Sequence, residues 1–203
     1  MSYKTGQEDF WAGKFGTDYI DRNNSKRLLY SKMLMWGKII KTTAGIQSIV
    51  EFGCNTGLNL EALKMLNPNF SLTGIEINQK AVEEVKKKDI AKIFHQSILE
   101  NISNIQADLT FTAGVLIHIN PDHLNNVYKN LVKISKRYIV IAEYYNPTPI
   151  SVNYRGFQDK LFKRDFAGEL IEQYKLKLLD YGFIYKHDKF APQDDINWFL
   201  LEK

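Results

Sequence analysis

The sequence predicts an α/β fold in which a mostly parallel β-sheet lies between two layers of helices. Three observations support this prediction. Residues 48–59 have the pattern of a buried strand, a glycine turn and the start of a helix. Strand-like and helix-like segments then alternate along the chain, which is typical of a parallel sheet. Near the end, residues 183–187 and 196–201 are two strand-like segments close enough to pair as an antiparallel hairpin.

Length and composition indicate one globular domain. The 203 residues are 44% hydrophobic, which is enough for a full core. The polar start has no signal-peptide core, no apolar stretch could span a bilayer, and the single cysteine, Cys54, fits a reducing compartment. The net charge of +4 is too small to indicate nucleic-acid binding. We therefore expect a cytoplasmic monomer or weak homodimer, with no metal, no membrane association and no nucleic-acid partner.

The first expected strand ends in a turn suited to ligand binding. Its apolar residues are interrupted near the carboxyl end by Glu51. Gly53 and Gly57 allow the backbone to turn sharply and approach a ligand, and Asn55 tolerates left-handed dihedral angles. Dinucleotide-binding turns require glycine at the third and sixth positions of the motif, where this chain has Asn55 and Leu58. The spacing therefore argues against a nicotinamide dinucleotide.

The next strands also place informative residues at their carboxyl ends. The second, at residues 70–78, contains Glu76, about twenty residues beyond the turn, where nucleotide-binding α/β folds place a carboxylate for the ribose hydroxyls. A short third strand is expected at residues 91–95. The fourth, at residues 108–112, is followed by Ala113-Gly114, which leaves open space for a ligand. Ligands of open α/β sheets bind at this edge.

The N-terminal segment has two interpretations. Residues 10–19 hold four aromatic side chains and two glycines, too aromatic for a disordered tail and too rich in glycine for a long helix. The segment either packs on its own domain as an arm or covers a ligand site as a lid. Asp21, Asn24 or Ser25 would cap the helix that follows, which is expected to continue to about Thr42.

The C-terminal half is less regular. After a fifth strand at residues 138–143, residues 144–165 show no clear periodicity and contain basic and aromatic side chains. They form either a surface crossover or a substrate-recognition loop. The next helix is expected to continue through Leu179 and to end at Gly182 in a left-handed cap.

The first turn resembles the first motif of the class I S-adenosylmethionine-dependent methyltransferases, Glu/Asp-x-Gly-x-Gly-x-Gly, with Asn55 in place of the middle glycine. This resemblance implies a Rossmann-like, three-layer α/β/α fold with a seven-stranded, mostly parallel sheet and an antiparallel C-terminal hairpin. It implies S-adenosyl-L-methionine as the cofactor and S-adenosyl-L-homocysteine as the product. In that family an Asp usually stands where this chain has Ser97, which leaves the adenine contact open. The residues implied for the cofactor are Glu51, Gly53, Cys54, Asn55 and Gly57 at the methionine moiety, Glu76 at the ribose, Ile77, Gln96, Ser97 and Ile98 at the adenine, and Ala113 and Gly114 beneath the sulfonium.

A narrower resemblance concerns the aromatic start, Leu-Ile-His-Ile-Asn-Pro at residues 116–121, and the stretch from residue 143 to 166. These look like the small methyltransferases associated with pseudaminic acid biosynthesis. The resemblance implies an anionic small-molecule substrate, such as a nonulosonic acid or its nucleotide-activated form. We expect the chain to divide into an N-terminal aromatic arm and helix at residues 1–44, acting as a lid, and an S-adenosylmethionine-binding methyltransferase domain at 45–203 with a substrate loop at about 144–165. The residues expected to bind substrate are Phe15, Tyr19, Asn146, Tyr154, Arg155, Lys163 and Arg164.

Methyl transfer from a sulfonium mainly requires alignment of the acceptor and exclusion of water. If the acceptor is a hydroxyl group, a base must remove its proton, and His118 is the first candidate. Glu143 and Tyr145 are the second choices. The alternative for His118 is a structural role at the start of the next helix.

Three other functions remain as alternatives. One is a nicotinamide-dependent oxidoreductase on a similar sheet, which the glycine spacing disfavours. Another is a protein that binds S-adenosylmethionine without catalysing transfer. The third is a nucleic-acid methyltransferase, although the Asp/Asn-Pro-Pro-Tyr/Phe-like segment expected after the fourth strand is replaced by Ala-Gly-Val-Leu at residues 113–116.

Overall fold

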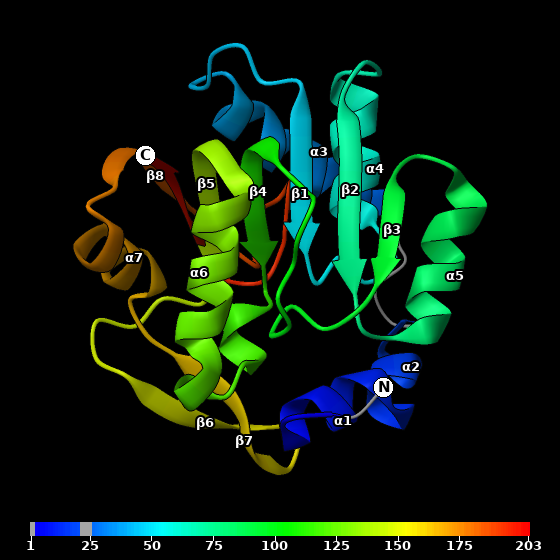
Figure 1. Cartoon of the computed structure of the whole chain (residues 1–203), viewed down its shortest axis with the longest axis vertical. Helices are drawn as coiled ribbons and strands as arrows, with labels where there is room; N and C mark the ends of the chain where they lie inside the picture. The colour runs from blue at the N-terminus through cyan, green and yellow to red at the C-terminus, as the bar shows by residue number, and fades with distance from the viewer. Residues whose placement is uncertain (1–2, 21–25) are drawn as a thin grey trace.

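The computed structural model describes residues 3–20 and 26–203 and contains a seven-stranded sheet with helices on both faces (Figure 1). The strand order is β3-β2-β1-β4-β5-β9-β8. Strands β1 to β5 run parallel, and β9 lies antiparallel between β5 and β8. The strands are β1 (Ser48–Phe52), β2 (Ser71–Glu76), β3 (Lys92–His95), β4 (Ala107–Ala113), β5 (Ser135–Glu143), β8 (Lys177–Ile184) and β9 (Ile196–Glu202). This sheet confirms the predicted fold class.

The helices divide into two layers because successive strand residues face opposite sides of the sheet. Ile49 of β1 belongs to a core with α3, α4 and α5, whereas Val50 belongs to a core with α6 and α7. Trp36 of α3 is fully buried in the first core, and its ring packs 4.4 Å from that of Phe111. The helices are α1 (Gly6–Ala12), α2 (Lys14–Ile20), α3 (Lys26–Ile40), α4 (Leu58–Leu66), α5 (Gln79–Lys88), α6 (Leu124–Ile134) and α7 (Phe166–Tyr174), with 3₁₀ turns at Leu116–His118 and Pro121–His123.

The expected end of the last helix is wrong. Helix α7 ends at Tyr174, where Lys175 adopts the left-handed conformation with φ of +56°. Leu178 and Gly182 belong instead to β8. A Cβ atom at Gly182 would lie 2.6 Å from the ring of Trp198 in β9, so glycine is required there for close packing and not as a helix cap.

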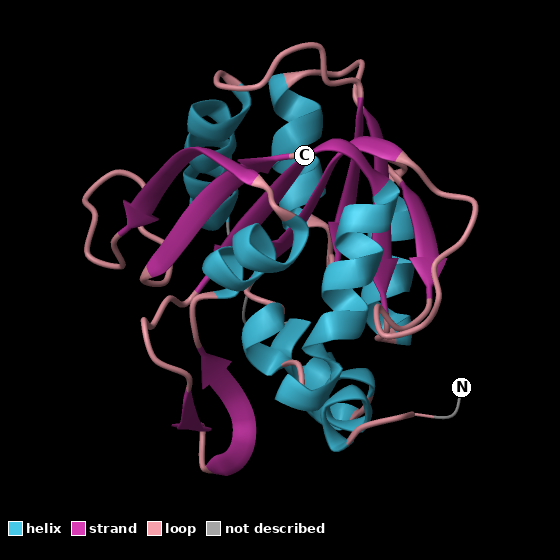
Figure 2. Cartoon of the chain, turned by 60° about the vertical axis from the view of Figure 1, so that its left-hand side comes forward, coloured by secondary structure: helices cyan, strands magenta, loops and turns pink. Residues whose placement is uncertain are grey.

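Residues 144–165, expected as an irregular loop, contain an antiparallel hairpin of β6 (Ile150–Tyr154) and β7 (Phe157–Lys163). The hairpin is separate from the main sheet and lies beyond the ends of the parallel strands, on the same side of the molecule as α1 and α2 (Figures 1 and 2). The side chain of Gln7 donates to the backbone oxygen of Asp159 at 2.9 Å, and Lys160 donates to that of Gly6 at 3.0 Å. These bonds join the hairpin to the N-terminal helices.

Helix α1 begins at a capping box. The Thr5 side chain accepts from the Glu8 amide, and the Glu8 carboxylate accepts from the Thr5 amide. The expected caps of α3, at Asp21, Asn24 or Ser25, lie outside the described residues. No helix within the described parts of the chain is long and apolar enough to cross a membrane.

Candidate active site

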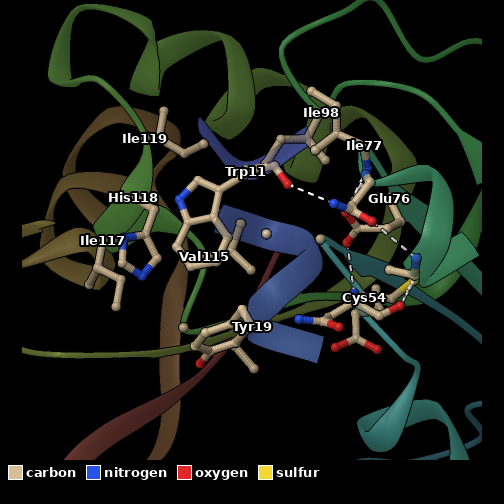
Figure 3. Close-up of a pocket in the computed structure, with 18 of the residues that line it drawn as sticks. Trp11, Tyr19, Cys54, Glu76, Ile77, Ile98, Val115, Ile117, His118 and Ile119 are labelled. Carbon is tan, nitrogen blue, oxygen red and sulfur yellow. Dashed lines mark hydrogen bonds between the residues drawn. The ribbon is translucent and has the colours of Figure 1, made fainter. Parts of the chain in front are cut away.

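A cavity of about 410 Å³ lies at the carboxyl ends of the parallel strands (Figure 3). This size is within the range of small-molecule sites. Its floor is formed by the ends of β1, β2, β3 and β4, and its cover comes from α1, α2 and the hairpin. Of the twelve residues predicted to contact the cofactor, only Gly57 does not line it; those that do are Glu51, Gly53, Cys54, Asn55, Glu76, Ile77, Gln96, Ser97, Ile98, Ala113 and Gly114.

The turn after β1 needs its glycines for two different reasons. Gly53 and Gly57 both have φ of +73°, and Asn55 has φ of +46°. A Cβ atom on Gly53 would lie 2.8 Å from Val115, which lines the cavity, whereas one on Gly57 would lie 2.9 Å from Val85 of α5. Gly53 therefore allows Val115 to pack closely against the turn, and Gly57 allows α4 to start close to α5.

Glu51 sits in a buried polar network beneath this turn. Its Oε1 accepts from the Asn59 side chain at 2.6 Å, and the Asn59 oxygen accepts from Lys32 at 2.9 Å. Its Oε2 is buried and has no hydrogen-bond partner within residues 3–20 and 26–203. Burial raises the pKa of Glu51 to about 8 and lowers the pKa of Lys32. An ammonium group from a ligand would satisfy the free oxygen and favour the ionised carboxylate, which fits the amino group of a methionine moiety.

Glu76 holds the turn as well as facing the cavity. Its Oε2 accepts from the Asn55 amide at 2.7 Å, and its Oε1 accepts from the amides of Ile77 at 2.8 Å and Asn78 at 2.7 Å. Burial raises the pKa of Glu76, while these three donors oppose the shift. A carboxylate has about four acceptor positions, so capacity for a ribose hydroxyl remains.

The N-terminal helices reach the same end of the cavity. The Asn78 side chain donates to the backbone oxygens of Trp11 at 3.0 Å and Ala12 at 3.3 Å. Ser97, after β3, donates a short hydrogen bond to the Glu8 carboxylate of α1. The segment therefore packs on its own domain where it lines the cavity, and its action as a lid stays a prediction.

His118 lies at the other end of the cavity, away from Glu76 (Figure 3). Its Nδ1 lies 2.6 Å from the backbone oxygen of Lys160 and can only donate to it, which places the lone pair on Nε2. Its ring packs 4.5 Å from that of Trp11 and 5.0 Å from that of Tyr154. Burial lowers the pKa of His118 to about 4, so the imidazole is neutral at physiological pH.

The other two candidate bases lie outside the cavity. Both carboxylate oxygens of Glu143 face the backbone amides of Val115, Leu116 and Ile117, at 3.0, 3.1 and 3.5 Å, so Glu143 caps the 3₁₀ turn that carries His118. Burial raises the pKa of Glu143 to about 7. Tyr145 is exposed beside Phe199. We therefore assign no catalytic role to either residue.

The residues expected to bind substrate are only partly brought together. Tyr19, Tyr154 and Arg155 line the cavity. Four others do not. They are Phe15, stacked on Phe10; Asn146, bonded to the backbone of Thr148; Lys163, beside Tyr144; and Arg164, paired with Glu169 at 2.6 Å. Phe15 belongs to α2, and the other three lie within or beside the hairpin, whose shape their sequence positions did not show.

Several lining residues were not predicted as site residues. Glu8, Trp11, Lys32, Asn59, Tyr144 and Asp194 all line the cavity. The capping box around Glu8 and the aromatic character of Trp11 are visible in the sequence. Their contacts with residues far along the chain are not.

Comparison with known proteins agrees with this geometry. A family model described as a methyltransferase domain matches residues 50–137. None of the curated proteins compared with the chain matches it. Similar solved structures include an S-adenosylmethionine-dependent methyltransferase from Clostridium acetobutylicum ATCC 824, with 14% identity, a TM-score of 0.65 and coverage of 91% of this chain and 95% of that one.

Two further structures extend the similarity to nearly the whole chain. Magnesium protoporphyrin IX methyltransferase from Synechocystis PCC 6803, solved with S-adenosylhomocysteine, has 12% identity, a TM-score of 0.69 and coverage of 97% of both chains. Mitomycin 7-O-methyltransferase has 12% identity, a TM-score of 0.72 and coverage of 98% of this chain and 61% of that one. At such identities the structures establish the fold. The chain is therefore similar, in its matched domain and in its fold, to the class I S-adenosylmethionine-dependent methyltransferases.

Proposed function

We propose that the protein transfers a methyl group from S-adenosylmethionine to a hydroxyl group of a small anionic acceptor. The observation that carries this proposal is the neutral, buried His118, whose Nε2 lone pair is available at the end of the cavity away from Glu76. A hydroxyl group needs a base to become a good nucleophile, and neutral histidine suits that task. Similar folds catalyse O-methylation in proteins such as the mitomycin 7-O-methyltransferase.

The bound cofactor supplies an activated methyl group on its sulfonium. The residues of the chain bind, align and dehydrate the reactants. Glu51 would hold the amino group of the methionine portion and Glu76 the ribose hydroxyls. His118 would take the acceptor proton on Nε2. The backbone oxygen of Lys160, 2.6 Å from Nδ1 of His118, fixes the orientation of the ring. Trp11 and Tyr154 pack against the imidazole and exclude water.

The acceptor end of the cavity favours a sugar acid. Trp11, Tyr19 and Tyr154 supply aromatic faces of the kind on which the apolar face of a sugar ring packs. Arg155, with its guanidinium 5.8 Å from the ring of Tyr154, supplies a positive charge for a carboxylate or phosphate. We therefore propose a nonulosonic acid of the pseudaminic type, free or nucleotide-activated, as the acceptor class.

The experiment is a transfer assay with S-adenosylmethionine labelled on its methyl group and a panel of sugar acids and CMP-activated sugar acids. His118→Ala should lower turnover by about 10²- to 10⁴-fold and leave the affinity for S-adenosylhomocysteine unchanged. His123→Ala is the matched control, because His123 lies in the next 3₁₀ turn and does not line the cavity. Near-normal turnover of His118→Ala would remove the base from the proposal. Tight cofactor binding with no acceptor in the panel would favour a non-catalytic binding protein.

A further inference from the structure

The corner of the cavity beside Ser97 contains a carboxylate that comes from outside the matched domain. Ser97, Gln96 and Ile98 follow β3, at the position that the class I motifs assign to the adenine. Ser97 itself has little capacity left for a ligand. Its hydroxyl donates to Glu8 and accepts from the Leu99 amide at 3.0 Å. A hydroxyl has a single proton, so Ser97 has no donor left, and its acceptor capacity is partly used.

Glu8 is held in this corner by contacts on both of its oxygens. Its Oε2 accepts from the backbone amides of Lys4 at 2.5 Å and Thr5 at 3.2 Å, which completes the capping box of α1. Its Oε1 accepts from Ser97. The residue is only 7% exposed and lines the cavity. A capping role explains Oε2, but it does not explain why the other oxygen is directed to the strand corner, 89 residues away in the sequence.

Helix α1 is fixed over this corner independently of Glu8. Asn78, at the N-terminus of α5, donates to two backbone oxygens of the N-terminal segment and caps α5 through its own side-chain oxygen, which lies 3.1 Å from the Ala81 amide. Gly16 of α2 fits closely beside the same side chain, because a Cβ atom there would lie 3.0 Å from the Asn78 nitrogen. The position of Glu8 is therefore determined by the fold of the segment and not by one hydrogen bond.

We propose that Glu8 supplies the carboxylate that accepts a hydrogen bond from the exocyclic amine of the adenine, in the place where the sequence has Ser97 instead of an acid. This proposal rests on the assignment of S-adenosylmethionine as the cofactor. An acceptor of this kind distinguishes adenine from a base with a carbonyl oxygen at the same position, because that oxygen and the carboxylate would both be acceptors. The N-terminal segment then contributes to cofactor selection as well as covering the cavity.

The test is calorimetric binding of S-adenosylhomocysteine and S-inosylhomocysteine to the full chain. In the inosyl compound, a carbonyl oxygen replaces the exocyclic amine. The wild type should bind S-adenosylhomocysteine at least about tenfold more tightly, since a hydrogen bond to a charged partner is worth that ratio or more. Glu8→Gln should weaken S-adenosylhomocysteine about tenfold and reduce the ratio to within about threefold, because the amide can donate to the carbonyl oxygen.

Glu8→Gln is chosen because glutamine also completes a capping box, so α1 should keep its start. Asp9→Asn is the matched control: Asp9 is an exposed acid on the same helix, and its substitution should leave both affinities unchanged. An unchanged ratio in Glu8→Gln, with tight binding of S-adenosylhomocysteine to the wild type, would overturn the role of Glu8 alone. Failure of the wild type to bind S-adenosylhomocysteine would overturn the cofactor site and this proposal with it.

Discussion

His118 is held so that one ring nitrogen donates to the protein and the other can accept a proton. The bond from Nδ1 to the backbone oxygen of Lys160 comes from the β6–β7 hairpin, while His118 itself follows β4. Glu143 contributes indirectly, because it accepts from the amides of the 3₁₀ turn. Lys160 and Glu143 therefore position the histidine, and of the three residues only His118 has a reactive atom available in the cavity.

The lowered pKa of His118 makes a specific prediction about pH. A base must be unprotonated, and a pKa of about 4 means that the imidazole is neutral at every higher pH. With S-adenosylmethionine at saturation, so that the titration of Glu51 does not limit cofactor binding, we expect kcat/KM for the acceptor to be level from about pH 6 to pH 8. It should fall only as the pH approaches the folded-state pKa of His118. The measurement is a pH–rate profile. An inflection near the ordinary histidine value of about 6.5 would show either a less buried ring or another base.

The same shift also affects stability, and its sign can be worked out. The unfolded chain protonates this histidine near its ordinary pKa, whereas the folded chain does so only near 4. Between these values the unfolded state binds more protons, so the free energy of unfolding falls as the pH is lowered through this window. Urea titrations of wild type and His118→Gln at several pH values should show a weaker acid dependence in the variant. Parallel curves would contradict the buried neutral form.

Substitution of Gly53 tests the close packing of the turn after β1. Gly53→Ala adds a Cβ atom 2.8 Å from Val115 at a φ of +73°. Gly45→Ala is the matched control, because Gly45 has a similar φ of +67° and open space around it. Both substitutions should lower the free energy of unfolding by about 1 kcal/mol or more because of backbone strain. Gly53→Ala should lower it by about 1–3 kcal/mol beyond that and should also weaken cofactor binding. Equal losses in urea unfolding, with unchanged binding, would contradict the proposed close approach.

At the scale of elements, the C-terminal strands show where local pattern and tertiary packing disagree. Leu178 and Leu179 follow Leu170, Ile171 and Tyr174 at helical spacing, which favoured a longer helix ending at Gly182. The chain instead turns at Lys175, and β8 pairs with β9 from Lys177 onward. This pairing, with the close packing of Gly182 on Trp198, joins residues too far apart in the sequence for a helical pattern to indicate it.

Gly182→Ala should therefore destabilise the sheet edge. The added Cβ atom would meet the buried Trp198 ring at 2.6 Å, and we expect a loss of about 1–3 kcal/mol in the free energy of unfolding. Gly37→Ala is the control within a helix: no atom lies within 4 Å of the new Cβ, so it should stabilise α3 by about 0.5–1 kcal/mol. If Gly182→Ala were neutral in urea unfolding, the close packing of β8 on β9 would be wrong.

The N-terminal helices and the hairpin form the other informative elements. Their aromatic and basic residues indicated a binding region, but the sequence did not predict how these segments fold. The hairpin directs Tyr154 and Arg155 into the cavity and Lys163 and Arg164 away from it. Alternation along a short, irregular hairpin is too weak a pattern to predict this, particularly with a register shift between Val152 and Tyr154.

For the whole molecule, the sheet and its ligand edge could be predicted because they depend on local features. The glycine turn, Glu76 at a strand end and Ala113-Gly114 each lie within a short segment whose direction follows from the parallel order of the strands. The cover of the cavity could not be predicted in the same way. Glu8 with Ser97 and Gln7 with Asp159 are contacts between distant segments, separated by 89 and 152 residues.

The central claim is that the cavity beneath α1 and α2 binds S-adenosylmethionine. Titration calorimetry of the full chain with S-adenosylhomocysteine and, separately, with NAD tests it most directly. We predict one binding site for S-adenosylhomocysteine, weakened by Gly53→Ala and unaffected by Gly45→Ala, and no binding of NAD. Binding of NAD without binding of S-adenosylhomocysteine would contradict the claim and would favour a nicotinamide-dependent oxidoreductase.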